Sequence, residues 1–142
     1  PVSILTRSSL CLRDMDLFKQ FQEIEIGLSI TTDDEETKKL FEPRSPSIES
    51  RIGALRTLRA NRIRTYAFIG PMLPLDPDRI VAMLTGAVDE VLIDRMNYPN
   101  KVKSIYRREK LEPYLEEEYS RRIGKILKKG FESKGIGVSM IF

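Results

Sequence analysis

The chain has 142 residues, of which 41% are apolar and 32% charged, and its 24 basic and 21 acidic side chains give a formal net charge of +3. That length suits one compact domain, and no stretch reaches the roughly 18 apolar residues that cross a bilayer. Histidine is absent and cysteine occurs once, at Cys11, so a disulfide scaffold, a thiolate zinc site and a self-contained iron–sulfur site are excluded within this chain. No secretory leader pattern begins the sequence, so we expect a cytoplasmic protein with no membrane partner.

Strands and helices alternate in the prediction for the first part of the chain. An apolar run at 2–5 predicts a buried strand, and alternating apolar residues at 24–30 predict a second one. Polar residues that can cap helices follow both runs. The expected helices begin at Asp14 and at Asp33 or Asp34, and they end near Phe21 and Phe41. The first of them is expected to bury Met15, Leu17, Phe18 and Phe21.

The rest of the chain continues this alternation. Ser45-Pro46 and Asp76-Pro77 have the cap-then-proline form that opens a helix. The first of these helices has the buried stripe Ile48, Ile52, Leu55 and Leu58. Strands are expected at 65–69, 90–94 and 135–142. One long basic helix, with Tyr114, Tyr119, Ile123, Leu127 and Phe131 among its apolar positions, precedes the last strand.

Short apolar strands that alternate with helices are typical of parallel β/α units whose helices cover the sheet. Four to five strands are too few to close the eight-stranded barrel that such units can form. The chain is therefore either a small open α/β domain or part of a larger barrel. We favour part of a TIM-like partial barrel, with residues 1–142 in a single domain.

Polar residues and turn-forming residues follow four of the predicted strands. Ligands of parallel α/β proteins bind at the carboxyl ends of the strands, so these segments form the candidate site. Arg7 offers a permanently charged fork to a carboxylate or phosphate, and Ser29, Thr31 and Thr32 offer hydroxyl groups. Taken singly, each residue is better explained as a helix cap, a turn or a surface ion pair, but their shared location favours a ligand. The segments are 6–8, 29–32, 70–74 and 94–97.

Positive charge gathers toward the C-terminus. Residues 1–100 hold 13 basic and 15 acidic side chains, net −2, whereas residues 101–142 hold 11 and 6, net +5. On the expected long helix, this charge is either a solvated face or a footprint for a phosphate backbone. The nucleic-acid candidates on that helix are Arg121, Lys125, Lys128 and Lys129.

Other signatures of chemistry are absent or weak. No glycine-rich dinucleotide fingerprint, P-loop or Gly-x-Ser-x-Gly motif follows a predicted strand. The acidic run at 33–36 is either a cation site or a helix N-terminus, and helix N-termini are the commoner reason for such a run. Cys11 lies between two leucines and is expected to be a small buried apolar residue rather than a reactive thiol. The sequence predicts no metal ligand.

An ordered set of segments gives the sequence its most specific feature. The segments are Val2-Ser-Ile-Leu-Thr-Arg-Ser, Arg13-Asp14, Gly27-Leu-Ser-Ile-Thr-Thr, Glu42-Pro-Arg-Ser-Pro-Ser, Arg51-Ile-Gly-Ala-Leu-Arg-Thr-Leu and Phe68-Ile-Gly-Pro-Met-Leu-Pro. In this order and spacing, the set resembles the later half of the radical S-adenosylmethionine (SAM) proteins related to spore photoproduct lyase, the DNA repair photolyase-like proteins. The resemblance covers residues 1–98 and becomes less distinctive after them.

The resemblance implies a partial α/β barrel in which a Cys-x-x-x-Cys-x-x-Cys loop holds a 4Fe–4S cluster. The cluster binds SAM through its amino and carboxylate groups and cleaves it to a 5′-deoxyadenosyl radical, which abstracts hydrogen from the substrate. By position, the resemblance implies that Arg7 binds the cofactor carboxylate and that Ser29 and Thr31 contact the cofactor at the next strand end. It also implies that Pro71 and Pro74 line the adenosyl side.

The cysteine loop of that family is missing, because Cys11 follows the first visible strand and the family places its loop upstream. Pro1 is also not an initiator methionine. We therefore expect the chain to be the C-terminal half of such an enzyme, with a missing N-terminal half as its partner. It then supplies part of the SAM and substrate side, binds neither cofactor completely and is inactive alone, whereas the complete lyase-like enzyme acts on DNA.

Two other interpretations remain open at this point. One is a non-catalytic α/β module that binds nucleic acid through its basic C-terminal helix. The other is a structural domain whose exposed half-barrel edge pairs with a second copy of the chain.

Overall fold

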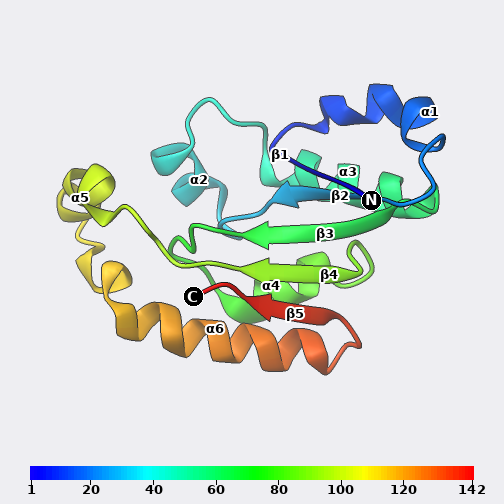
Figure 1. Cartoon of the computed structure of the whole chain (residues 1–142). Coiled ribbons are helices and arrows are strands. Elements are labelled where there is room, and N and C mark those ends of the chain that lie inside the picture. The colour runs from blue at the N-terminus through cyan, green and yellow to red at the C-terminus, as the bar shows by residue number, and fades with distance from the viewer.

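The computed structural model describes all 142 residues, and one five-stranded parallel sheet forms its centre (Figure 1). The strands lie in the sheet in chain order, and every neighbouring pair is parallel. This arrangement confirms the predicted fold class, because parallel neighbours require a crossover between the end of one strand and the start of the next. The strands are β1 (Val2–Thr6), β2 (Ile24–Ser29), β3 (Arg64–Ile69), β4 (Glu90–Ile93) and β5 (Gly137–Met140).

Helices cover one face of the sheet and leave the other face without a helix (Figure 1). The α-helices are α1 (Met15–Phe18), α2 (Glu35–Phe41), α3 (Ile48–Ala60), α4 (Pro77–Leu84), α5 (Pro99–Arg108) and α6 (Glu117–Glu132), and 3-10 helices span Ser9–Asp14 and Glu112–Leu115. α3 packs against β2 and β3, and α6 packs against α4 and β5. α2 and α5 lie beyond the carboxyl ends of the strands, on the side to which the arrows point. None of these helices combines the length and the apolar character that crossing a membrane requires.

The covered face of the sheet forms the hydrophobic core, because side chains alternate between the two faces of a strand. Ile26 and Leu28 of β2, and Val91 and Ile93 of β4, are fully buried on this face. The helices contribute the predicted stripe Ile48, Ile52, Leu55 and Leu58 from α3, together with Ile80, Val81 and Leu84 from α4. The core therefore lies between the sheet and its helices, and the other face of the sheet is not covered by a helix.

That other face, here called the open face, consists of the alternate residues of the strands. Its members are Ser3, Leu5, Glu25, Gly27, Ser29, Arg64, Tyr66, Phe68, Glu90, Leu92, Gly137 and Ser139. In its middle, the Tyr66 ring occupies the space that a side chain at its register partner Gly27 would need. The Tyr66 hydroxyl donates to the backbone oxygen of Ile4 at 3.2 Å. This ring therefore links β3 to β1 across β2 and separates the two ends of the open face.

The predicted helix between the first two strands is wrong in extent. A 3-10 helix occupies Ser9–Asp14, and α1 then ends at Phe18 after a single turn. Phe18 is buried, but Leu17 and Phe21 are 53% and 43% exposed. One helical turn cannot bring all the apolar residues of this segment onto one buried side, so the hydrophobic spacing was misleading.

Two later helix boundaries also differ from the prediction. Ser47, not Ser45, caps α3, and its hydroxyl accepts a backbone N–H at 3.1 Å. The expected long basic helix corresponds to α6 but starts later, because Tyr114, its first predicted apolar position, lies in the 3-10 helix Glu112–Leu115 and α6 begins at Glu117. Sequence analysis missed α5, of which only Tyr106 is buried.

Candidate functional site

The carboxyl ends of the strands lie along one edge of the sheet, where backbone hydrogen bonds tie the loops together. The N–H of Leu73 donates to the oxygen of Thr31 at 3.1 Å, and the N–H of Met72 donates to the oxygen of Asp94 at 3.1 Å. The loops after β2, β3 and β4 therefore form one continuous surface. In parallel α/β proteins, this is the edge at which ligands bind.

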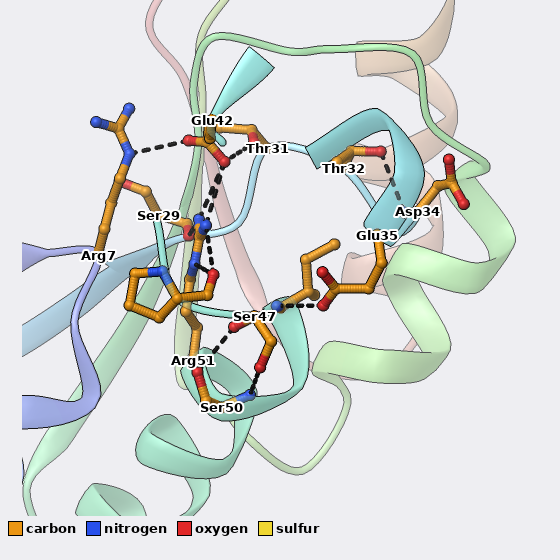
Figure 2. A network of polar contacts seen from close by, with 12 residues as sticks. Arg7, Ser29, Thr31, Thr32, Asp34, Glu35, Glu42, Ser47, Ser50 and Arg51 are labelled. Atoms are coloured by element: carbon orange, nitrogen blue, oxygen red, sulfur yellow. Dashed lines mark hydrogen bonds and ion pairs between the residues drawn. The ribbon is translucent and has the colours of Figure 1, made fainter. Parts of the chain in front are cut away.

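Glu42, the residue that follows α2, is the centre of a polar network at this edge (Figure 2). Its Oε2 accepts from the Thr31 hydroxyl at 3.1 Å and from both terminal nitrogens of Arg51 at 3.2 Å. Its Oε1 lies 3.0 Å from Nε of Arg7 but accepts no directed hydrogen bond. One carboxylate, only 9% exposed, thus connects the loop after β1, the loop after β2 and α3.

Arg51 anchors this network, and its side chain is fully buried. All five of its N–H groups have acceptors, because the backbone oxygens of Ser29 and Pro46 accept at 2.9 to 3.1 Å in addition to Glu42. Sequence analysis missed both Glu42 and Arg51. The available signal was the position of Arg51 three residues after Ile48, which places a charged side chain on the buried stripe of the helix.

The network holds one positive charge in excess, since two arginines share the Glu42 carboxylate. The donors of Arg51 are all used, so the excess is available only at Arg7, whose side chain is 49% exposed. In Figure 2, the terminal nitrogens of Arg7 point away from Glu42. This arrangement suits an anion with one carboxylate or phosphate group. A hollow of about 310 Å³ lies here, and Arg7, Arg44, Pro71, Met96 and Val102 are among its lining residues.

The other predicted cofactor residues lie at the same edge but differ in accessibility. Ser29 and Thr31 are 5% and 1% exposed, and the hydroxyl of buried Thr32 donates to the Pro74 oxygen at 2.7 Å. Pro71 lines the hollow, whereas Pro74 does not. The structure thus brings Pro71 to the hollow and holds the hydroxyls of Thr31 and Thr32 in internal hydrogen bonds.

The acidic run after β2 stabilises the local fold. Asp33 accepts the N–H of Asp76 at 2.7 Å and pairs with Arg79 at 3.1 Å. Asp34 caps α2 by accepting from the backbone and the hydroxyl of Thr37 at 2.9 and 2.8 Å. These hydrogen bonds from Thr37 hold the pKa of Asp34 below its usual value. Both carboxylates therefore have protein partners.

Cys11 is partly buried against the core, and this burial raises the pKa of its thiol. No group of three or more His, Cys, Asp or Glu side chains is placed to hold a metal ion. A 4Fe–4S cluster is held by several cysteine thiolates. The residues of this chain therefore do not fit such a cluster.

The residues predicted to contact nucleic acid lie on the exposed side of α6. Two of them face glutamates of the same helix, at 3.0 Å and 3.9 Å, and these pairs cancel part of the positive charge. The other two are exposed and have no ion-pair partner. The paired residues are Arg121 and Lys128, and the unpaired ones are Lys125 and Lys129.

A second basic surface, which sequence analysis missed, lies on α5 beyond the carboxyl ends of the strands (Figure 1). α5 carries four basic residues and no acidic one. Nζ of Lys101 lies 5.0 Å from the centre of the Tyr98 ring, which is 69% exposed. Lys103 and Arg107 are exposed and unpaired. In such an arrangement, the cations can bind a phosphate backbone and the exposed aromatic ring can stack on a base.

A larger hollow, of about 910 Å³, lies at the opposite edge, where the strands begin. Arg64 at this edge lies 3.6 Å from Glu25 and 3.1 Å from Glu90. The three side chains are 28% to 60% exposed, so water screens their attraction. No predicted site residue reaches this hollow, and parallel sheets bind ligands at the other edge. Its size alone therefore does not identify it as the site.

Comparison with known proteins gives relatives in sequence and in fold, although no protein-family model matches the chain. An uncharacterized protein of Methanocaldococcus jannaschii is 38% identical over 153 residues, which cover 96% of this chain and 58% of that protein. An uncharacterized protein of Acidianus two-tailed virus is 22% identical over 144 residues, which cover 89% of this chain and 47% of that protein. A solved structure of a mutant spore photoproduct lyase matches 99% of this chain and 50% of the lyase, with a TM-score of 0.66 and 13% identity.

The chain therefore spans about half the length of the proteins that it matches. At 13% identity, the similarity to the lyase shows a shared fold alone. That fold is a parallel β/α sheet of the kind found in partial TIM-like barrels, in agreement with the strand order of this chain.

Proposed function

We propose that this chain is the C-terminal part of a radical SAM enzyme related to spore photoproduct lyase. The observation that carries the proposal is the uncompensated positive charge at Arg7, at the ligand-binding edge of a sheet whose fold is similar to that of the lyase. An arginine with free terminal nitrogens binds a carboxylate through two parallel hydrogen bonds. The methionyl part of SAM carries one such carboxylate.

Of the predicted cofactor residues, Arg7 and Pro71 line the hollow at this edge, whereas Ser29, Thr31 and Pro74 do not. In the proposal, Arg7 binds the carboxylate, Ser29 and Thr31 contact the same end of the cofactor, and Pro71 and Pro74 line the adenosyl side. The hollow of about 310 Å³ holds part of the molecule, and residues outside this chain hold the rest. Bound together, SAM and a 4Fe–4S cluster supply radical chemistry. The contribution of this chain is to bind and orient the cofactor.

The rest of the proposal concerns the complete protein. Its cluster is held by cysteines of an N-terminal half, which pairs with the free edge of β1. The complete enzyme works in the cytoplasm. This chain alone is inactive. The support is that the matching proteins extend well beyond the matched region and that β1 is an edge strand. A second copy of the chain on that edge is the competing partner.

DNA is the substrate that we propose for the complete enzyme, in a repair reaction similar to that of spore photoproduct lyase. The support comes from α5, which has exposed cations beside Tyr98. Val102 of α5 lines the same hollow as Arg7. A strand held on α5 therefore lies close to the proposed cofactor site.

SAM binding by the full-length, cluster-loaded protein tests the main proposal. Arg7→Gln removes a charged hydrogen-bond donor, so we expect the affinity for SAM to fall at least about tenfold, for a loss of roughly 1.5–3 kcal/mol. Arg64→Gln at the opposite edge is the matched control and is expected to change nothing. Isothermal titration calorimetry gives both affinities. Equal affinities for the Arg7 and Arg64 variants would overturn the proposal.

A non-catalytic nucleic-acid-binding module is the second candidate, because Lys125 and Lys129 of α6 are exposed and unpaired. Fluorescence anisotropy with labelled single-stranded DNA at several salt concentrations separates the two surfaces. If α5 binds the strand, Lys103→Gln with Arg107→Gln lowers the salt slope by about 0.7 for each phosphate that is no longer neutralised. If α6 binds the strand, the salt slope is lowered by Lys125→Gln with Lys129→Gln instead. That result favours the non-catalytic nucleic-acid-binding module.

A further inference from the structure

Glu42 is fixed by both its backbone and its side chain. Its N–H donates to the oxygen of Lys38 at 2.7 Å at the end of α2, and its own oxygen accepts from the N–H of Ser45 at 3.0 Å. Its Oε2 accepts from Thr31 and from the fully buried Arg51. The carboxylate therefore has one position at the edge of the hollow, set by its own segment 38–45, by the loop after β2 and by α3.

Arg7 is held on one side only. Its Nε lies 3.0 Å from Glu42, whereas its terminal nitrogens have no protein partner and point away from Glu42 (Figure 2). Oε1 of Glu42 is buried and receives no directed hydrogen bond, so charge attraction rather than a well-aligned bond orients Arg7. An arginine that is oriented before the ligand arrives loses less rotamer freedom on binding.

We propose that Glu42 is the positioning residue for carboxylate recognition at Arg7, an inference that rests on the proposed function. Glu42 holds the Nε side of Arg7 and so presents the terminal edge to the SAM carboxylate in the orientation for two parallel hydrogen bonds. It also neutralises one of the two arginine charges. The network therefore accepts one carboxylate, and Glu42 acts through Arg7 without touching the ligand.

Glu42→Asp tests this role, because aspartate keeps the charge but is one methylene shorter and cannot reach both Arg7 and Arg51. In the full-length, cluster-loaded protein we expect the affinity for SAM to fall about tenfold. The affinity for decarboxylated SAM is expected to stay unchanged, since it has no carboxylate for Arg7 to bind. Glu25→Asp, the matched change in the ion pairs of the opposite edge, should alter neither affinity. Calorimetric titration of both ligands into each variant gives the comparison.

Several results would overturn the role of Glu42. An equal loss for SAM and decarboxylated SAM would show that Glu42 only supports the fold, and no loss for either ligand would show that Arg7 does not need it. Because both ligands are compared in the same variant, reduced stability alone cannot produce the expected difference. In the Arg7→Gln background, Glu42→Asp should have no further effect on SAM binding.

The Arg7→Gln variant also separates this inference from the proposed function. If Arg7→Gln leaves SAM binding unchanged, the proposed function fails and the role of Glu42 fails with it. If Arg7→Gln weakens SAM binding and Glu42→Asp does not, the cofactor site stands and only the positioning role is overturned.

Discussion

The two edges of the sheet carry ion networks of opposite composition. At the carboxyl edge, Glu42 lies between two arginines, and at the amino edge, Arg64 lies between two glutamates. Arg51 is fully buried and Glu42 is 9% exposed, but Arg64 is 60% exposed. Water screens the second network far more than the first. We therefore base the proposed ligand site on the buried charge of the carboxyl edge, although the larger hollow lies at the amino edge.

The largest expected effect is a difference in unfolding free energy between two variants, each of which lacks one arginine at one edge. Arg51→Met leaves the half-exposed Arg7 as the only charged partner of the buried Glu42 carboxylate and removes the donors to Ser29 and Pro46. Breaking a buried pair in this way costs about 3–5 kcal/mol of unfolding free energy. The matched Arg64→Met should cost about 0–1 kcal/mol, because its pairs are exposed. Urea unfolding followed by circular dichroism measures both, and equal losses would contradict the contrast between the edges.

A smaller effect is expected in the middle of the open face, where Tyr66 separates the two edges. In Gly27→Ala, the new Cβ overlaps the Tyr66 ring, so the ring must move and its bond to Ile4 is lost. Overpacking of this kind costs about 1–3 kcal/mol. Gly53→Ala in α3 is the control, because nothing lies within 4 Å of its Cβ. We expect Gly53→Ala to stabilise the protein by about 0.5–1 kcal/mol.

The same unfolding experiment distinguishes the two glycines. A loss of stability in both variants would indicate a general intolerance of alanine at these positions. No loss in Gly27→Ala would show that Tyr66 moves freely and does not join β1 to β3. Near-ultraviolet circular dichroism reports whether the tyrosine environment changes.

The sequence predicted the sheet well, because the signal for a buried strand is local. The alternation at 24–30 and the apolar run at 65–69 each mark a strand, and Arg7 is recognisable because it directly follows one. The centre of the site was not predictable in the same way. Glu42 and Arg51 acquire their roles from contacts with residues that are distant in the chain, and a charge in a connector or a helix is usually solvated.

α5 shows a different limit of prediction. It buries only Tyr106, although Val102, Ile105 and Tyr106 have the i, i+3, i+4 spacing of an amphipathic helix and Pro99 stands at its first position. Because α5 was missed, the sequence assigned the basic C-terminal charge to one helix. The structure divides that charge between α5, beside the carboxyl edge, and α6, along β5.

The smallest expected effect concerns α2, the helix that directly precedes Glu42 and lies at the carboxyl edge. Asp34→Ala removes the N-cap of this helix and should cost about 1 kcal/mol. The pKa of Asp34 is lowered in the folded protein, so its carboxylate contributes stability above the ordinary aspartate pKa, and this contribution is lost as the pH falls through the lowered value. Asp34→Asn keeps an acceptor that does not titrate, so the stability difference between wild type and Asp34→Asn should shrink in acid.

Amide hydrogen exchange shows whether that loss stays at the carboxyl edge. The N–H of Ser45 donates to Glu42 beyond the end of α2, and the N–H of Thr65 donates to Asp89 near the amino edge. We expect Asp34→Ala to speed exchange at Ser45 and to leave Thr65 unchanged, because local opening of α2 releases the first bond and not the second. Equal acceleration at both amides would mean that the edges unfold together, and the buried network around Glu42 would then owe its position to the whole sheet rather than to the helix before it.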